Sequence, residues 1–257
     1  DASGAIPVQS VVDALRDDTI LVSLMMVNNE TGAVTDISAV SRELKRAGSQ
    51  ALLHTDAVQG FMKVPFRAKT LGADMISISG HKIHAPKGIG ALYIRAGLKL
   101  KPFIVGGSQE SGMRAGTEAM PQIAAFGAAS EIAYAGMKEN IARMSALRER
   151  AVSRLERDIP ELRVISSADS APHILSISLP GWRSEVLMNF LEARGVYVSR
   201  SSACKKGGRS HVLEAVGLDA KTIDGAIRVG LSRLTTEENI DALCDALRDA
   251  HDTLAHR

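Results

Sequence analysis

The stretch Asp74-Met-Ile-Ser-Ile-Ser-Gly-His-Lys-Ile-His-Ala-Pro-Lys-Gly88 indicates how the first half of the chain folds. Its first six residues are a short apolar run, which predicts a buried strand, and a polar, glycine-bearing loop follows. Similar strands are predicted at residues 20–27, 51–54 and 90–95, with helices at 8–16 and 36–47. Strands that alternate with crossovers predict an α/β sheet with helices on both faces, in which ligands bind beyond the carboxyl ends of the strands.

A different pattern begins after the glycine-rich loop at residues 106–116. Few helix breakers interrupt residues 120–158, which predicts one or two long helices. The remaining chain predicts a smaller α+β domain. Its expected strands are 173–179, 195–198 and 226–231, its expected helices are 184–194 and 235–251, and 199–208 is expected to be an exposed loop. The last helix starts with Thr-Thr-Glu-Glu, which resembles a capping box. We therefore expect a large domain over 1–119, and a linker helix with a small domain over 120–257.

Composition excludes several classes of protein. Forty-five per cent of the residues are hydrophobic, 4% are aromatic, and the formal net charge is +2. A small charge and few aromatics argue against nucleic-acid binding, and the apolar runs are too short to span a bilayer. Two distant cysteines make no disulfide framework, which favours a reducing compartment, the cytoplasm. The chain starts at Asp1, in what resembles a turn within a longer protein, so we expect a fragment or a cleaved product.

Polar residues with chemical potential follow two of the predicted strands. Asp56 and Gln59 come after one strand, and Ser79, His81 and Lys82 come after another. A lysine in such a place can form an imine with a carbonyl cofactor. Pyridoxal phosphate needs that lysine, a carboxylate for its ring nitrogen, donors for its phosphate and a donor near its ring oxygen, and these residues could supply each.

Other interpretations of these residues remain open. A solvated lysine and a turn aspartate would fit the same pattern. His81 and His84 could be ordinary loop residues or two ligands of a metal, although no further histidine or cysteine lies at the usual zinc spacing.

The second half contains two further candidates. Cys204 lies in Ser199-Arg-Ser-Ser-Ala-Cys-Lys-Lys-Gly-Gly208, where nearby cations would favour the reactive thiolate. A chance surface cysteine is the alternative. Arg228 lies within a predicted strand among apolar residues, and such an arginine usually has a fixed anionic partner, either a bound carboxylate or a structural ion pair. Cys244 lies on the apolar face of a helix, so we expect it to be buried.

Six stretches together resemble the cysteine desulfurases, in the class V aminotransferase group of fold-type I pyridoxal-phosphate enzymes. They run in family order over nearly the whole chain: Val27-Asn-Asn-Glu-Thr-Gly32, His54-Thr-Asp-Ala-Val-Gln59, Ser79-Gly-His-Lys-Ile-His-Ala-Pro-Lys-Gly88, Gly112-Met-Arg-Ala-Gly-Thr117, Ser201-Ser-Ala-Cys204 and Ile227-Arg-Val-Gly-Leu-Ser-Arg-Leu-Thr-Thr236. The resemblance implies the fold-type I architecture, namely part of a large, mostly parallel sheet domain and a smaller α+β domain.

The resemblance also implies a role for each residue of the cofactor site. Lys82 would hold the cofactor as an imine, Asp56 would pair with the ring nitrogen, and Gln59 would bond the ring oxygen. Phosphate would be bound by Ser79 and His81, and His81 is also a candidate catalytic residue together with Lys82 and Cys204. Thr117 would reach the phosphate of a neighbouring subunit, so a homodimer is implied. No metal site is implied.

The substrate site and the reaction are implied in the same way. Asn29 would lie beside cofactor and substrate, and Arg228 would clamp the carboxylate of L-cysteine. Cys204 would take the sulfur as a persulfide and release alanine. The sulfur would then pass to an acceptor protein, an iron–sulfur scaffold or a tRNA-thiolation relay protein.

One departure from the family affects this expectation. The family has a further N-terminal region of more than a hundred residues, which completes the large sheet and is not in this sequence. Rival hypotheses are therefore another class V aminotransferase or a lyase, which would not need Cys204, and a non-catalytic module that docks a sulfur acceptor.

Overall fold

The computed structural model describes residues 1–201 and 209–254, and these form two compact units. The parallel-sheet unit consists of Val8–Met26 and Asp36–Met137. The antiparallel-sheet unit combines Asp1–Pro7, Val27–Thr35 and Lys138–Arg257. Two short N-terminal segments thus pack with the C-terminal half of the chain. The boundary expected between residues 119 and 120 stays a prediction.

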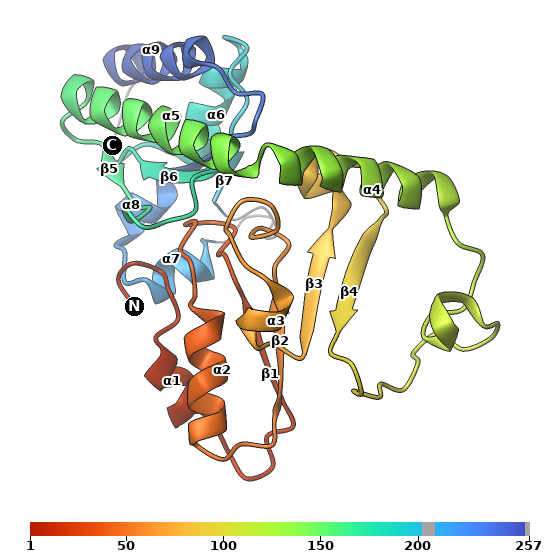
Figure 1. The fold of residues 1–257 in the computed structure, drawn as a ribbon. Helices are drawn as coiled ribbons and strands as arrows, with labels where there is room; N and C mark the ends of the chain where they lie inside the picture. Colours follow the sequence, from red (N-terminus) through yellow and green to blue (C-terminus); the bar gives the residue numbers. More distant parts are fainter. Residues whose placement is uncertain (202–208, 255–257) are drawn as a thin grey trace. The chain divides into compact units, whose positions relative to one another are not determined.

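The parallel-sheet unit contains a four-stranded mixed sheet in the order β1-β2-β3-β4 (Figure 1). The first three strands are parallel and β4 runs antiparallel to β3. The strands are β1 (Leu21–Met25), β2 (Leu52–Asp56), β3 (Met75–Ser79) and β4 (Gly90–Ile94), and the helices are α1 (Val8–Asp13), α2 (Ile37–Arg46), α3 (Ala68–Leu71) and α4 (Met120–Ala135). This architecture confirms the predicted α/β class.

Helix α2 forms where the sequence predicts it. The side chain of Asp36 caps its start by accepting the backbone N–H of Ala39, which satisfies one of the free donors of the first turn. Its apolar residues recur at helical spacing and are buried, namely Ile37, Val40 and Leu44.

Strand β1 differs from the prediction of a fully buried strand. Val22 is buried, but Leu21 is 47% exposed and Met25 is 39% exposed. The physical reason is that β1 is an edge strand of this four-stranded sheet, and that side chains alternate between a packed face and an open face. An apolar run alone does not tell which faces of a strand are covered.

The antiparallel-sheet unit contains a second four-stranded sheet, in the order β5-β6-β8-β7. Its strands are β5 (Arg163–Val164), β6 (Ile174–Ser178), β7 (Ser199–Arg200) and β8 (Ala226–Gly230), and its helices are α5 (Met137–Asp158), α6 (Ser184–Glu192), α7 (His211–Ala215), α8 (Ala220–Asp224) and α9 (Glu237–Thr253). The central strands and helices α5, α6 and α9 share one apolar core that includes the fully buried Leu175, Leu187 and Leu247.

The strand predicted at residues 195–198 is wrong, because the chain becomes extended only at Ser199. Gly195 has a φ of +75°, and the backbone N–H of Val196 returns to the carbonyl of Leu191. These residues therefore complete the C-terminal cap of α6, and a left-handed glycine is typical of such caps. Their backbone groups are used by the helix end rather than by the sheet.

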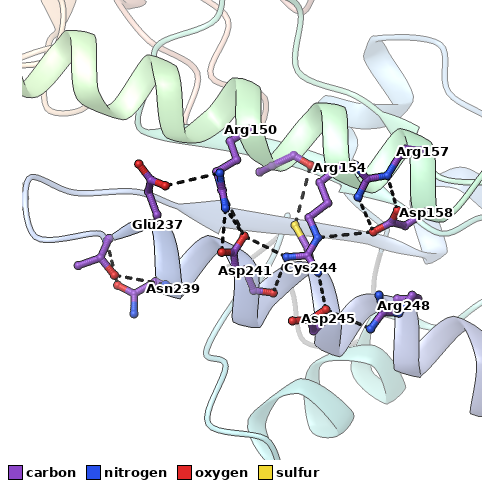
Figure 2. Close-up of polar contacts among 12 residues, drawn as sticks. Arg150, Arg154, Arg157, Asp158, Glu237, Asn239, Asp241, Cys244, Asp245 and Arg248 are labelled. Atoms are coloured by element: carbon purple, nitrogen blue, oxygen red, sulfur yellow. Dashed lines mark hydrogen bonds and ion pairs between the residues drawn. The ribbon is translucent and has the colours of Figure 1, made fainter.

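An ion-pair network links the two long helices α5 and α9 (Figure 2). Arg150 contacts Asp241 at 2.9 Å, and Arg154 contacts both Asp241, at 2.9 Å, and Asp245. Cys244 is buried, as expected, and burial raises the pKa of its thiol to about 11. The thiol is therefore protonated at neutral pH and takes no part in nucleophilic chemistry.

Helix α9 begins at Glu237, two residues later than predicted. Thr236 caps the helix, and its partner in the capping box is Asn239 rather than a glutamate. The two residues exchange hydrogen bonds between side chain and backbone. The predicted type of cap is thus confirmed, with an amide in the place of the carboxylate.

Candidate functional site

The carboxyl ends of β2 and β3 place predicted site residues on one face of the sheet. Asp56 is the register partner of Ser77, and Ser79 lies two residues further along β3. Directly opposed residues and residues at i and i+2 share a face. Asp56 and Ser79 therefore share a face at the edge of the sheet where ligands bind in open α/β sheets.

Lys82 and His81 lie on a tight turn that continues directly from β3. This turn, Gly80–Ile83, is a 3₁₀ helix, and it ends at His84 in a left-handed conformation. The Oγ of Ser79 lies 2.7 Å from Nδ1 of His81. Partial desolvation, together with the positive charges of Lys82, Lys63 and Lys87, lowers the pKa of His81. A neutral, hydrogen-bonded ring and a hydroxyl thus stand beside the lysine.

The other residues predicted for the cofactor differ in their setting. Asp56 is exposed, and its Oδ1 accepts the backbone N–H of Val58 at 2.9 Å. This bond fixes the carboxylate at the start of the loop after β2. Gln59 is half-buried in the same loop. Thr117 lies in the irregular segment before α4 and is exposed.

In the antiparallel-sheet unit, the structure brings Asn29 and Arg228 together, although 199 residues separate them in the sequence. The guanidinium of Arg228 donates to the backbone carbonyl of Asn29 at 2.7 Å. Burial lowers the pKa of Arg228, and the negative charge of Glu30 acts in the opposite direction. A half-buried guanidinium that keeps further donors is suited to a carboxylate ligand.

The loop that carries Asn29 is rigidly held within its unit. The side chain of Asn28 accepts the backbone N–H groups of Glu30 and Thr31. Ser210 donates to the buried carboxyl of Glu30 at 2.5 Å, and burial raises the pKa of this carboxyl. Ser210 also caps α7. Cys204 itself lies outside the described residues.

Two features of the parallel-sheet unit were not predicted from the sequence. Lys63, seven residues after Asp56, donates its ammonium to the backbone carbonyl of Lys82 at 2.7 Å. His54 bridges the hydroxyls of Ser23 and Ser77, at 2.8 Å and 2.9 Å, across three strands on the face that Asp56 shares. No motif signals either feature, because both depend on strand register and on loop packing.

Two structural features are absent from the described part of the chain. Within residues 1–201 and 209–254, no group of three or more histidine, cysteine, aspartate or glutamate residues could hold a metal ion. The same residues contain no helix that is long and apolar enough to cross a membrane.

A mixed, mostly parallel sheet with an aspartate, a serine–histidine pair and a lysine at its carboxyl edge defines a class of protein, the fold-type I pyridoxal-phosphate enzymes. The family model "Aminotransferase class-V" matches residues 1–243. The chain belongs to this family, whose members use pyridoxal phosphate as cofactor.

Individual relatives agree with this assignment. "Cysteine desulfurase 2" of Trichormus variabilis is 44% identical over 244 residues, which cover 94% of this chain and 61% of the relative. The solved structure of a "NifS-like protein" matches with a TM-score of 0.91 and 36% identity, over 99% of this chain and 67% of that one. "SspA in complex with cysteine" matches with a TM-score of 0.73 and 30% identity, over 92% and 65%. The chain thus spans about 61% of the length of the curated relative.

The residues at the sheet edge fit pyridoxal phosphate by their chemistry. A carboxylate, a hydroxyl next to an imidazole, and an amine are the groups that bind its ring nitrogen, its phosphate and its aldehyde. When bound, this cofactor supplies an electron sink for bond cleavage at the α- and β-carbons of an amino acid. The amine of Lys82 would be the group of this chain that holds the cofactor and moves protons.

Proposed function

We propose that this chain carries the cofactor and substrate residues of a cysteine desulfurase, which converts L-cysteine to L-alanine. The observation that carries the proposal is the shared face of Asp56 and Ser79, continued by the turn that bears His81 and Lys82. Two comparisons support this particular reaction. The class V family model matches residues 1–243, and relatives of the chain bear the name cysteine desulfurase.

Each residue at the sheet edge takes one role in the proposal. Lys82 binds the cofactor covalently through its amine. Asp56 keeps the ring nitrogen protonated, because a nearby carboxylate favours a positive charge. Ser79 and His81 bind the phosphate, and Gln59 bonds the ring oxygen.

Substrate binding is assigned to the antiparallel-sheet unit. Arg228 binds the carboxylate of L-cysteine through guanidinium N–H groups other than the one that donates to the carbonyl of Asn29. Asn29 lies beside the bound amino acid. The contact between Arg228 and Asn29 supports this pairing of roles.

Cys204 accepts the sulfur. Its thiolate attacks the sulfur of L-cysteine, a new S–S bond forms, and the bond between sulfur and the β-carbon breaks. The β-carbon keeps the electron pair and takes up a proton, so that the products are a persulfide on Cys204 and L-alanine. Lys82, once free of the cofactor, is the group that moves protons at the substrate carbons.

Partners and compartment follow from the same proposal. The persulfide sulfur goes to an acceptor protein, an iron–sulfur scaffold or a tRNA-thiolation relay. In the proposed homodimer, Thr117, which is exposed in the single chain, reaches the phosphate of the second subunit. A reducing compartment such as the cytoplasm suits a reactive cysteine, and the free, buried Cys244 agrees with it.

The proposal is tested in the complete native polypeptide that contains these 257 residues. We expect a yellow absorption band with pyridoxal phosphate that is absent in Lys82→Ala. We also expect release of sulfide from L-cysteine in the presence of dithiothreitol, and its loss in Cys204→Ala. A colourless wild-type protein that remains folded would refute the proposal.

The same variants separate the rival functions. A class V aminotransferase would keep its transamination activity in Cys204→Ala, because that reaction uses no sulfur nucleophile. A docking module would bind an iron–sulfur scaffold protein while it remains colourless. We expect neither result.

A further inference from the structure

A second lysine lies against the turn that carries Lys82. Lys63 is half-buried in the loop that follows β2, and its Nζ lies 2.7 Å from the backbone carbonyl oxygen of Lys82. An ammonium that donates to a carbonyl makes a charge-assisted hydrogen bond, which is stronger than a neutral one. This bond joins the loop after β2 to the turn after β3.

The loop around Lys63 has a tight backbone conformation. Met62, which precedes the lysine, has a φ of +60°, a left-handed conformation that is unfavourable for a residue with a side chain. Two residues earlier, Gly60 is buried, and a Cβ atom there would come within 2.5 Å of the sulfur of Met26. The backbone N–H groups of Lys63 and Val64 both bond the carbonyl of Gly60. The loop is thus tight and fixed, and so is the lysine on it.

The electrostatic setting of Lys63 is unusual. Burial, together with the positive charge of Lys82, lowers the pKa of its ammonium to about 8. His81 and Lys87 are the other titratable groups of this cationic cluster, and the pKa of His81 is lowered by desolvation and then by the charges of the three lysines.

We propose that Lys63 is a positioning residue for Lys82: its ammonium anchors the turn of Lys82 by the backbone carbonyl and keeps a positive charge beside the amine of Lys82. The anchor fixes the direction from which the lysine reaches the cofactor. The charge favours the neutral amine, since a nearby like charge disfavours protonation, and the neutral amine is the form that condenses with an aldehyde. This inference rests on the proposed role of Lys82.

The test measures the amine of Lys82 directly, without cofactor. In the native polypeptide, freed of pyridoxal phosphate, the rate at which acetic anhydride labels Lys82 is followed against pH by peptide mass spectrometry. In Lys63→Met we expect the midpoint to move up by about 0.5–1 pH unit, which slows labelling about three- to tenfold below the midpoint. Lys63→Gln, which keeps a donor without the charge, should show the same shift.

Charge-preserving and distant variants complete the experiment. Lys63→Arg keeps the cation and should restore the wild-type midpoint. Lys45→Met removes an exposed lysine from α2 in the same unit and should leave the midpoint unchanged. A second readout is the affinity for pyridoxal phosphate from its absorption band, which should fall in Lys63→Met and recover in Lys63→Arg.

The outcomes separate this inference from the proposed function. An unchanged labelling midpoint in both neutral variants, or a Lys63→Arg variant that shifts as far as Lys63→Met, would overturn the role of Lys63. A wild-type protein that forms no yellow band would overturn the proposed function, while the labelling experiment would still report on the two lysines.

Discussion

Replacing Arg228 tests how the carboxylate of the substrate is bound. The side chain of Arg228 is half-buried in β8, on the face opposite to its buried neighbours Ile227 and Val229, and one of its nitrogens donates to the carbonyl of Asn29. Arg228→Lys keeps the charge but has no planar pair of donors, so at least one charge-assisted hydrogen bond to the carboxylate is lost. Such a bond contributes about 1.5–3 kcal/mol.

That loss corresponds to a fall in kcat/KM for L-cysteine of roughly 10- to 150-fold, at about 1.4 kcal/mol for each factor of ten. The assay is sulfide release with dithiothreitol in the complete native polypeptide. Cysteamine, which is cysteine without the carboxylate, is the matched substrate, and we expect its weaker reaction to change little in Arg228→Lys. The preference of the enzyme for L-cysteine over cysteamine should therefore shrink by the same factor.

The control variant is Arg163→Met, which removes an exposed arginine from strand β5 of the same sheet. It should keep the wild-type preference. A folded Arg228→Lys variant that retains the full preference for L-cysteine would refute the role of Arg228, and so would an equal loss for both substrates, which would indicate a purely structural role. Urea unfolding of each variant identifies any loss of stability.

Three further predictions concern groups buried or paired in the antiparallel-sheet unit. Because the folded pKa of Cys244 is raised from 9.0 to about 11, its stabilising effect is complete below pH 9 and is lost as pH rises toward 11. The free energy of unfolding should fall over this range by about 3 kcal/mol, and Cys244→Ala should abolish this fall in urea titrations. Ser210→Ala removes the donor to the buried carboxyl of Glu30 and should destabilise by about 1–2 kcal/mol. Burial raises the pKa of Glu30 and the hydrogen bond from Ser210 lowers it, so the loss in Ser210→Ala should grow as the pH rises through the titration of this carboxyl. A loss that does not depend on pH would contradict the reasoning. A double-mutant cycle should show a favourable coupling energy between Arg154 and Asp245. This coupling energy should become smaller in 1 M salt. A coupling energy that does not depend on salt would show that packing rather than charge joins the two residues.

Local patterns were sufficient for most elements of the fold. The apolar runs before Asp56 and Gly80 formed strands, and helix α2 formed with the cap that Asp36 predicts. These features depend on residues that are close together in the sequence, so the local sequence pattern predicts them directly. The family was also predicted, because its motifs are short and lie in order along the chain.

Predictions failed where packing between distant segments decided the outcome. The exposure of Leu21 and Met25 depends on what covers each face of β1. The path of residues 195–198 depends on how α6 ends, at a left-handed Gly195 that was expected to start a strand. The candidate role of each site residue stays a prediction. These residues are Asn29, Asp56, Gln59, Ser79, His81, Lys82, Thr117, Cys204 and Arg228.

The sequence alone determined which chemical groups the protein has and on which elements most of them lie. Only the tertiary structure decided which groups share a face or are in contact. Asp56 shares a sheet face with Ser79, Arg228 contacts the carbonyl of Asn29, and Lys63 contacts the carbonyl of Lys82. The physical reason is that side-chain periodicity is a local property of the backbone. Strand register and loop packing, by contrast, are set by the burial of apolar surface over the whole unit.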